Sequence, residues 1–287
     1  MRNARRLLGS FIFIIGIAPL TAAPAFGQQF EVIYPNGLTA VAEKALPPQV
    51  YLSQQNILEI KGEFFPKNQP DAQPWIVQAT GFIEKASGHV VSARHLLVET
   101  VMDLAERYNE PFYIDENGVF QGVDYDYKFF AVLNTATARL EYPLEVVAMG
   151  PMDTYLDVIL FKPLKKIPVK NLALSSNIKP GDKVYASGFT TQDTHYHKAN
   201  GKTARVTTDK IKFTAEHVVL AILQNETIAS IGVKKLYRLA KPTQSGFSGG
   251  PVFNTGGQVI GIMIEKDSIF SFAISSDDIT TVIKSIK

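Results

Sequence analysis

The chain of 287 residues contains no cysteine and a single tryptophan, and charged residues make up only 20% of it. Without cysteine it can form no disulfide, no thiolate nucleophile and no zinc–thiolate site. Its 29 basic and 27 acidic residues nearly cancel, which argues against a nucleic-acid partner because phosphate binding requires a strongly basic face. Any nucleophile or metal site must therefore be built from Ser, Thr, His, Asp, Glu or Lys.

Apolar material for a packed core is, by contrast, ample, because 46% of the residues are hydrophobic. This composition is typical of a globular protein rather than a disordered or fibrous one. A domain usually spans about 100 to 200 residues, so the length indicates one large domain or two packed halves.

Residues 1–27 have the three parts of a secretory signal: arginines, an apolar run over residues 7–20 and small residues before a cleavage point. The apolar run is shorter than the roughly 20 residues that a transmembrane helix needs. Cleavage before Gln28 fits the pattern better than cleavage after Ala25; the alternatives are an uncleaved anchor and a twin-arginine signal. Removal takes away three basic residues and no acidic one, which leaves a net charge of −1. We expect an exported protein, periplasmic or secreted, that keeps no stable membrane anchor.

The mature chain divides into three parts. Prolines interrupt residues 28–75, and we predict an extended arm or a removable propeptide there. The rest consists of short runs rich in Val, Ile, Phe, Tyr and Thr between turns, a pattern typical of an all-β barrel or sandwich. A proline-containing stretch separates a half at 76–168 from a half at 169–287. The strand-like runs are at 76–83, 90–92, 125–133, 144–148, 158–161, 183–186, 203–208, 235–239 and 258–264.

Two segments have helical spacing instead. Apolar residues recur with a helical period over residues 96–107. Ser276 and the two aspartates after it are typical of a helix cap, and an amphipathic stretch follows to Ile286. We therefore expect one internal helix and one C-terminal helix.

The strongest local signal is the run Ser245-Gly246-Phe247-Ser248-Gly249-Gly250-Pro251-Val252. At average glycine and proline contents, Gly-x-Ser-Gly-Gly-Pro arises by chance in such a chain with a probability on the order of 10⁻⁴. Glycines let the backbone turn tightly and direct N–H groups into a concave site, where they can bind an oxyanion. We infer an exposed, nucleophilic Ser248 in this turn, and the alternative is a glycine-rich hairpin.

A serine nucleophile needs a base that removes its proton and a third group that orients the base. His95 follows a short strand-like run and small residues, and it precedes the predicted internal helix. Asp157 stands at the start of the apolar run 158–161, where its carboxylate is shielded from water and can accept a hydrogen bond from an imidazole. These two residues are the candidate base and orienting acid.

The other four histidines are weaker candidates. His89 lies in a predicted turn, and His217 lies in an apolar run, where we expect a partly buried, hydrogen-bonded side chain. His195 and His197 occupy alternate positions, as two metal ligands on one strand do, but no third ligand is indicated nearby. We expect a solvated loop there and no metal site.

In these motifs the chain resembles the chymotrypsin-like serine proteases, and within them the cysteine-free bacterial HtrA-type and related trypsin-like enzymes. The order His, Asp, Ser is that of this family and differs from the orders in subtilisins and α/β-hydrolases. The resemblance covers the chain from about Gln78 onward and implies two packed six-stranded antiparallel β-barrels with the site between them. The matching segments are Thr80-Gly81-Phe82-Ile83, Ser92-Ala93-Arg94-His95, Asp157-Val158-Ile159-Leu160, Gly246 to Val252, Val259-Ile260-Gly261-Ile262 and Phe272-Ala273-Ile274.

The resemblance also implies the roles of single residues. Ser248 is the nucleophile, His95 the general base and then acid, and Asp157 the group that fixes the imidazole. The backbone N–H groups of Gly246 and Ser248 form the oxyanion hole. The implied activity is that of a serine endopeptidase acting on proteins or peptides without a cofactor. A catalytically silent double barrel that binds a protein in the cell envelope is the alternative, and an esterase on another fold is less favoured.

The sequence departs from the family pattern at several points. Phe247 stands where the family usually has Asp or Asn, which excludes trypsin-style activation by a new N-terminus and leaves open whether Phe247 disturbs the oxyanion loop. The stretch between His95 and Asp157 is longer than in compact HtrA-type members. The chain ends shortly after the second half, so we expect a protease without a PDZ domain.

The resemblance places five residues along the substrate. Thr243 precedes the nucleophile, and residues 264–266 are expected to pair with an extended peptide by strand addition. No acidic residue stands at the expected pocket base, so we expect a small or medium apolar residue before the cut rather than Lys or Arg. The predicted substrate-binding residues are Thr243, Ile264, Glu265, Lys266 and Phe270.

Overall fold

The structure is a computed structural model. It describes residues 45–67, 73–107, 113–114, 120–121, 125–134, 139–190, 195–199, 202–206, 211–243 and 245–286. The predicted signal segment lies outside these ranges. None of the helices within the described ranges has the length and apolar character that crossing a membrane requires.

The first barrel consists of six antiparallel strands that close in the order β1-β2-β3-β8-β7-β6. Apolar side chains that alternate along these strands fill its interior, and the amphipathic helix α2 (His95–Arg107) packs on it with its apolar face. The strands are β1 (Ile57–Pro66), β2 (Trp75–Ile83), β3 (Val90–Ser92), β6 (Tyr125–Asn134), β7 (Arg139–Met149) and β8 (Ile159–Pro163). Strands β4 (Tyr113–Ile114) and β5 (Phe120–Gln121) pair separately.

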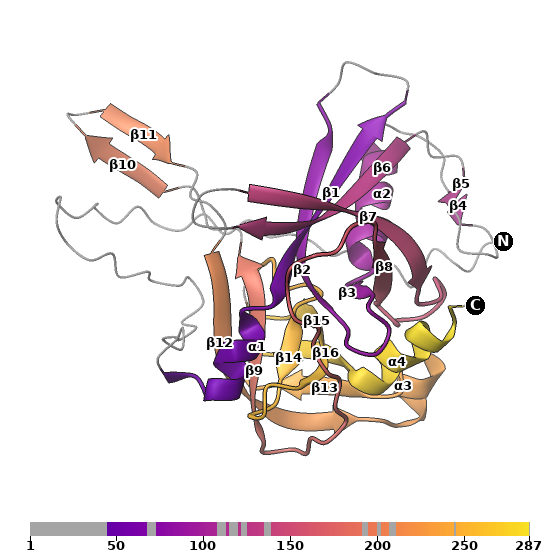
Figure 1. Cartoon of the computed structure of the whole chain (residues 1–287). Coiled ribbons are helices and arrows are strands. Elements are labelled where there is room, and N and C mark those ends of the chain that lie inside the picture. Colours follow the sequence, from indigo (N-terminus) through magenta and orange to yellow (C-terminus); the bar gives the residue numbers. More distant parts are fainter. Residues whose placement is uncertain are drawn as a thin grey trace.

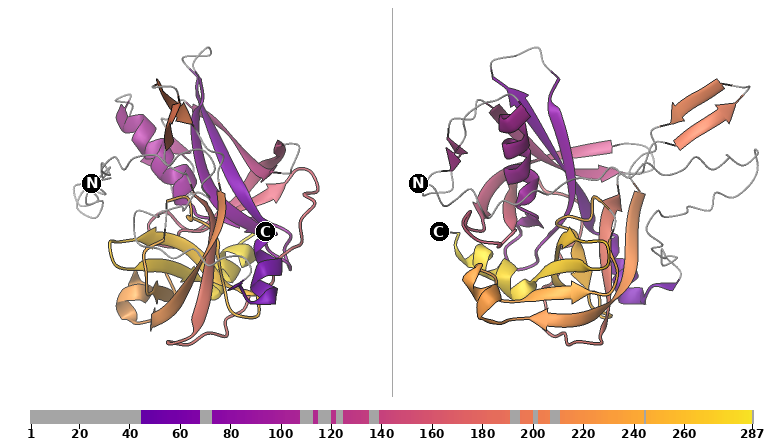
Figure 2. Two further views of the ribbon diagram at one scale, coloured as in Figure 1. Left: turned by 90° about the vertical axis from the view of Figure 1, so that its left-hand side faces the viewer. Right: turned by 180° about the vertical axis from the view of Figure 1, so that it is seen from behind.

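The second barrel also closes from six antiparallel strands, in the order β12-β13-β16-β15-β14-β9. The two barrels stack on each other, as Figures 1 and 2 show, which confirms the predicted architecture. The strands are β9 (Lys183–Thr190), β12 (Ile211–Leu223), β13 (Leu236–Leu239), β14 (Pro251–Phe253), β15 (Val259–Lys266) and β16 (Ser271–Ser275), with the helices α3 (Glu226–Ser230) and α4 (Ser276–Lys284). The N-cap of α4 is Ser275, one residue before the predicted cap.

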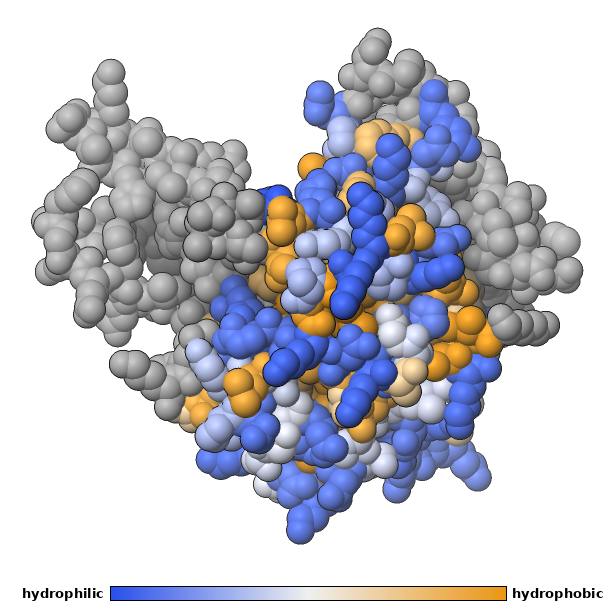
Figure 3. All heavy atoms as spheres, in the orientation of Figure 1, coloured by the Kyte–Doolittle hydropathy of each residue, from blue (hydrophilic) through white to orange (hydrophobic). Residues whose placement is uncertain are grey.

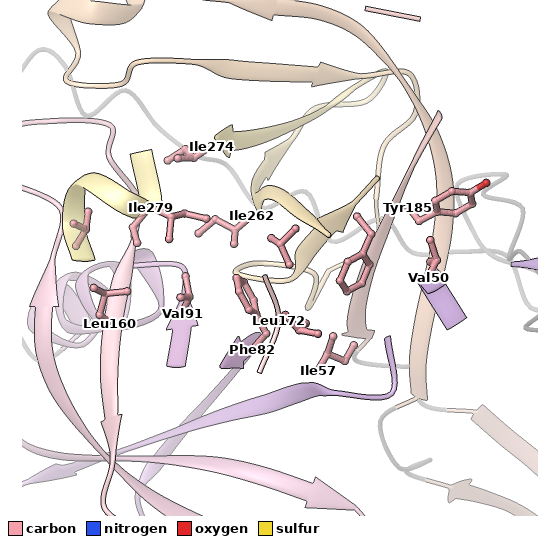
Figure 4. Close-up of a cluster of buried hydrophobic side chains, with 14 of the residues drawn as sticks. Val50, Ile57, Phe82, Val91, Leu160, Leu172, Tyr185, Ile262, Ile274 and Ile279 are labelled. Atoms are coloured by element: carbon pink, nitrogen blue, oxygen red, sulfur yellow. The ribbon is translucent and has the colours of Figure 1, made fainter. Parts of the chain in front are cut away.

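Three apolar clusters build the core: one inside each barrel and one between the barrels. In the third cluster, Phe82 and Leu160 of the first barrel pack with Ile262 of the second and Ile279 of α4 (Figure 4). Because burying a large aliphatic or aromatic side chain contributes about 1.5–3 kcal/mol, this shared cluster holds the two barrels in a fixed relation. A site between the barrels therefore has rigid walls.

The expectation of an extended arm over residues 28–75 is wrong for its described part. Residues 57–66 form β1, which pairs with β2 on one side and with β6 on the other. The first barrel thus begins at Ile57 rather than at residue 76, and removal of this segment would open it. Proline is tolerated at the end of a strand, so Pro66 ends β1 without preventing it.

The arm also contains the short helix α1 (Pro48–Gln54), which begins with proline at its first position, where no N–H is needed. α1 precedes the first barrel in sequence but packs on the second (Figure 2). Val50 is buried in the cluster between the barrels, and the Ser53 hydroxyl donates a 2.7 Å hydrogen bond to the Gly257 carbonyl. This segment therefore ties the two barrels together.

A hairpin of β10 (His195–Ala199) and β11 (Lys202–Val206) follows β9. His195 and His197 thus lie on a strand rather than in the predicted loop. Over the face in Figure 3, hydrophilic residues dominate and apolar residues lie in small groups among them.

Candidate active site

His95 and Asp157 form a double hydrogen bond at the start of α2. The first N–H groups of a helix lack partners within the helix and attract negative charge. The Asp157 Oδ1 accepts the backbone N–H of His95 at 2.7 Å, and its Oδ2 lies 2.6 Å from the His95 Nδ1. The two side chains are only 23% and 15% exposed. One carboxylate therefore fixes both the backbone and the ring of His95.

Electrostatics reinforce this pair. Burial opposes protonation of His95, but the charge and hydrogen bond of Asp157 prevail and raise the pKa of His95 from 6.5 to about 9. Burial also disfavours the ionised form of Asp157, yet the His95 charge, the hydrogen bonds and Arg94 hold the pKa of Asp157 below its ordinary value. Asp157 therefore stays ionised beside the imidazole, as a group that stabilises the imidazolium must.

Arg94 is a further residue of the candidate site that the sequence reasoning missed. Its buried guanidinium donates hydrogen bonds of 2.9 Å to the carbonyls of Gly150 and Thr154 and a further one to Pro151. These carbonyls lie on the segment that leads to Asp157. Arg94, the residue before His95, thus fixes the backbone segment that leads to Asp157. An arginine among small apolar residues at a strand end was the one available signal.

The Ser248 loop lies against the segment that leads to His95. Gly249 has a φ of +74°, and a Cβ there would collide with the Ser92 hydroxyl, the Thr80 carbonyl and the Ala93 N–H. Only glycine adopts this conformation and this approach without strain. The loop is closed by a 2.7 Å hydrogen bond from the Gly250 N–H to the Phe247 carbonyl. The turn therefore places the half-buried Ser248 next to the segment that leads to His95.

The Phe247 side chain points into the second barrel. It is 1% exposed, lies in the interior of the second barrel and meets Phe213 edge to face at 5.9 Å. Gly188 leaves the room for its ring. Within the described residues, the N–H groups of Gly246 and Ser248 have no protein acceptor. The packing of Phe247 in the core of the second barrel therefore anchors the Ser248 loop.

Residues 79–262 match the family model of the trypsin-like peptidase domain. The chain belongs to the trypsin-like peptidase family. A comparison with curated proteins finds no match. Among solved structures, the fold is similar to the active form of the Rv3671c protease from M. tuberculosis, with a TM-score of 0.53 and 14% identity over 91% of this chain and 94% of that one.

Two further structures have the same fold. Deg5 superposes with a TM-score of 0.51 and 15% identity over 81% of this chain and 89% of that one. The HtrA-type protease AlgW with a decapeptide superposes with a TM-score of 0.53 and 15% identity over 86% of this chain and 67% of that one. The family model and the fold together confirm the resemblance to trypsin-like and HtrA-type proteases.

The predicted substrate-binding residues of this trypsin-like peptidase lie on two segments of the second barrel. Thr243 is buried, and its N–H donates to the Ser271 hydroxyl at 2.7 Å. Residues 264–266 form the end of β15. The Phe270 ring, just before β16, lies under the Arg238 guanidinium at 5.0 Å. Their roles toward a substrate stay predictions.

Two carboxylates interact electrostatically with the His95–Asp157 pair. Burial raises the pKa of Glu265, and the negative charges of Asp267, Glu99 and Asp157 add to this effect. Glu99, one turn after His95 on α2, has a raised pKa for the same kind of reason. Glu265 thus lies within electrostatic range of Asp157 and His95, although sequence reasoning placed it only along the substrate.

The remaining histidines take no part in this site. His89 is half-buried before β3. His217 is 1% exposed on β12, and within the described residues neither ring nitrogen has a hydrogen-bond partner, so the expected hydrogen bond is wrong. Its cross-strand partner on β9 is Val184, an apolar residue of the second barrel's core that offers no side-chain hydrogen-bonding group. The described residues contain no cluster of three metal-ligating side chains.

Proposed function

We propose that this trypsin-like peptidase is an exported serine endopeptidase that cleaves peptide bonds through Ser248, His95 and Asp157. The observation that carries the proposal is the double hydrogen bond between Asp157 and His95. The packing of Gly249 against the segment leading to His95 supports the position of the nucleophile. A histidine without a catalytic role would need neither the double hydrogen bond to a carboxylate nor a serine loop packed beside it.

The chemistry follows from these positions. The His95 Nε2 takes the Ser248 hydroxyl proton as the Ser248 Oγ attacks the peptide carbonyl carbon. The N–H groups of Gly246 and Ser248 bind the resulting oxyanion, and the Asp157 carboxylate stabilises the imidazolium. His95 then protonates the leaving amine, which yields an ester on Ser248. Water, deprotonated by His95, attacks this acyl-enzyme and releases the acid product.

The substrate is a protein or peptide chain bound in extended form. The end of β15 has backbone groups that can pair with a peptide by strand addition. Thr243 is buried beside Ser271. Because no acidic residue stands at the expected pocket base, we propose a small or medium apolar residue before the cut. Residues 1–27 direct the chain out of the cytoplasm as a cleaved signal, to the periplasm or the medium.

The proposal is tested with purified mature protein, casein and a labelled peptide library. Wild-type protein is expected to cleave both, and Ser248→Ala is expected to lose cleavage by several orders of magnitude. Ser230→Ala, an exposed serine on α3 of the same barrel, serves as the matched control and is expected to keep full activity. Equal activity of Ser248→Ala and wild type would overturn the proposal. A folded but inactive wild type would instead support the silent double barrel.

A further inference from the structure

Thr80 on β2 connects the catalytic parts of the two barrels. It is fully buried, and each of its polar groups has a partner. Its N–H donates to the Ser248 carbonyl at 2.9 Å, and its hydroxyl donates to the Gly246 carbonyl at 2.8 Å. The same hydroxyl accepts the Phe189 N–H at 2.9 Å, and the Thr80 carbonyl accepts the Ser92 hydroxyl at 2.8 Å. One residue thus contacts the nucleophile loop, β9 and the strand that leads to His95.

The two carbonyls that Thr80 holds belong to the two residues whose N–H groups form the proposed oxyanion hole. Gly246 has a φ of +93°, a conformation that glycine adopts freely and that leaves the peptide on either side of it easy to rotate. A hydrogen bond to its carbonyl therefore limits the rotation of the loop. The bond from the Thr80 N–H fixes the Ser248 carbonyl, in the peptide that follows the Ser248 Cα, and so limits the movement of the residue that carries the second donor.

The hydroxyl of Thr80 also fixes the Ser248 loop relative to β9. Gly246 packs so closely on β9 that a Cβ would collide with the Phe189 carbonyl. The Phe189 N–H donates to the Thr80 hydroxyl, which in turn donates to Gly246. The loop is thus held between β2 of the first barrel and β9 of the second. The Thr80 hydroxyl thus uses its one donor toward Gly246 and accepts one hydrogen bond from Phe189.

We propose that Thr80 is a positioning residue for the oxyanion hole: from the first barrel, its hydroxyl and N–H align the two donors that the second barrel supplies. The inference rests on the proposed function, because it assumes that Gly246 and Ser248 bind an oxyanion. It predicts that loss of the hydroxyl impairs the chemical step more than substrate binding. Interactions made only in the transition state affect kcat rather than KM.

The test replaces Thr80 with Val, which keeps the shape and the backbone bond to Ser248 but removes the hydroxyl. Loss of a whole oxyanion donor lowers kcat by about 10²–10³-fold, so misalignment of the donors is expected to lower it about 10- to 100-fold. KM on a peptide substrate is expected to stay within about 2-fold. Thr80→Ser, which restores the hydroxyl, is expected to keep kcat within about 3-fold of wild type.

Thr100→Val is the matched control. Thr100 is also buried, on the helix α2 that packs on the first barrel, and its hydroxyl donates a 2.9 Å hydrogen bond to the Leu96 carbonyl within α2. The same chemical change there is expected to leave kcat unchanged. A fall in kcat common to both valine variants would show a general packing effect and overturn the assignment.

A peptide aldehyde gives a second readout. The Ser248 Oγ adds to the aldehyde carbon, its proton passes to His95, and the former carbonyl oxygen becomes an oxyanion in the hole. The affinity of Thr80→Val for the aldehyde is expected to fall about as far as its kcat, roughly 10- to 100-fold. The affinity for the same peptide with a terminal amide in place of the aldehyde is expected to stay constant. A merely structural defect would weaken both ligands.

The outcomes separate this inference from the proposed function. A folded wild-type protein that does not cleave peptides overturns both. Active wild type together with an unchanged kcat in Thr80→Val, or with a defect confined to KM, overturns the inference alone. If Thr80→Val does not fold, Thr80→Cys is measured instead, because a thiol of similar size is only a weak donor. The same fall in kcat is expected, and its absence contradicts the role of the hydroxyl.

Discussion

Acid should destabilise this protein through His217, whose ring inside the second barrel has no hydrogen-bond partner among the described residues. The side chain is 1% exposed. Burial, and then the charge of Lys241, lower its pKa to about 4, against 6.5 for an exposed histidine. The unfolded chain therefore binds this proton more readily between these two pH values. The stability due to the neutral side chain is complete above pH 6.5 and is lost as the pH falls toward 4.

The size of the effect follows from the two pKa values. Each unit of pKa difference corresponds to about 1.4 kcal/mol, so the full loss is about 3 kcal/mol. Between about pH 7.5 and about pH 5 the linkage relation gives a loss of about 2 kcal/mol. The free energy of unfolding is measured in urea at both pH values, for wild type and for His217→Leu.

The leucine variant cancels the carboxylates that titrate in the same range, because they are present in both proteins. Wild type is expected to lose about 2 kcal/mol more than His217→Leu over this interval. Since an apolar side chain of similar size leaves no unpaired nitrogen, the variant is also expected to be at least as stable at neutral pH. Equal pH dependence in the two proteins would refute the reasoning and show that His217 can be protonated in the fold.

Two further predictions concern the Ser248 loop and the proposed triad. Asp157→Asn should lower kcat by about 10⁴-fold. Because Asp157 raises the pKa of His95, the variant should also move the acidic limb of the kcat/KM profile from above pH 6.5 to lower pH. An unmoved limb in a pH–rate profile would contradict this coupling. Phe247→Ala should cost about 3–5 kcal/mol in urea unfolding because it leaves a cavity in the second barrel, and Phe247→Leu should cost less. A loss below about 1 kcal/mol for Phe247→Ala would speak against its place in the core.

Features of the candidate site that depend on residues close together in the sequence could be predicted. The Ser248 motif could be read directly, because glycines in a tight turn and a serine between them have a physical meaning in the sequence itself. His95 could be predicted from the change of a strand-like run into a helical one. The two barrels could be expected from the resemblance, since short strands alone allow a barrel or a sandwich.

The first strand was missed because prolines obscured it. In β1, Leu58, Ile60 and Phe64 alternate into the barrel core, a pattern that indicates a half-buried strand. Pro66 and the prolines after it suggested an irregular arm, but Pro66 only ends the strand. Likewise, the prolines before α1 suggested a break, whereas Pro48 begins the helix. Proline restricts where an element begins and ends, and it does not exclude one nearby.

Arg94, Thr80 and the unpaired state of His217 could not be predicted for a different reason. Thr80 bonds to Gly246 across 166 positions of the sequence, and Arg94 bonds to carbonyls 56 to 60 positions away. Residue type shows that a side chain can donate a hydrogen bond, but only the tertiary fold determines which carbonyl accepts it. The same holds for Phe247, whose place in the core depends on the space left by Gly188.

The central claim is that Ser248 is a nucleophile activated by His95. The most direct measurement treats the purified mature protein with a fluorophosphonate and locates the modified residue by peptide mass spectrometry. We predict modification of Ser248 alone in wild type, its absence in Ser248→Ala and strong slowing in His95→Ala. Modification of another serine, or none in a folded wild-type protein, would contradict the account.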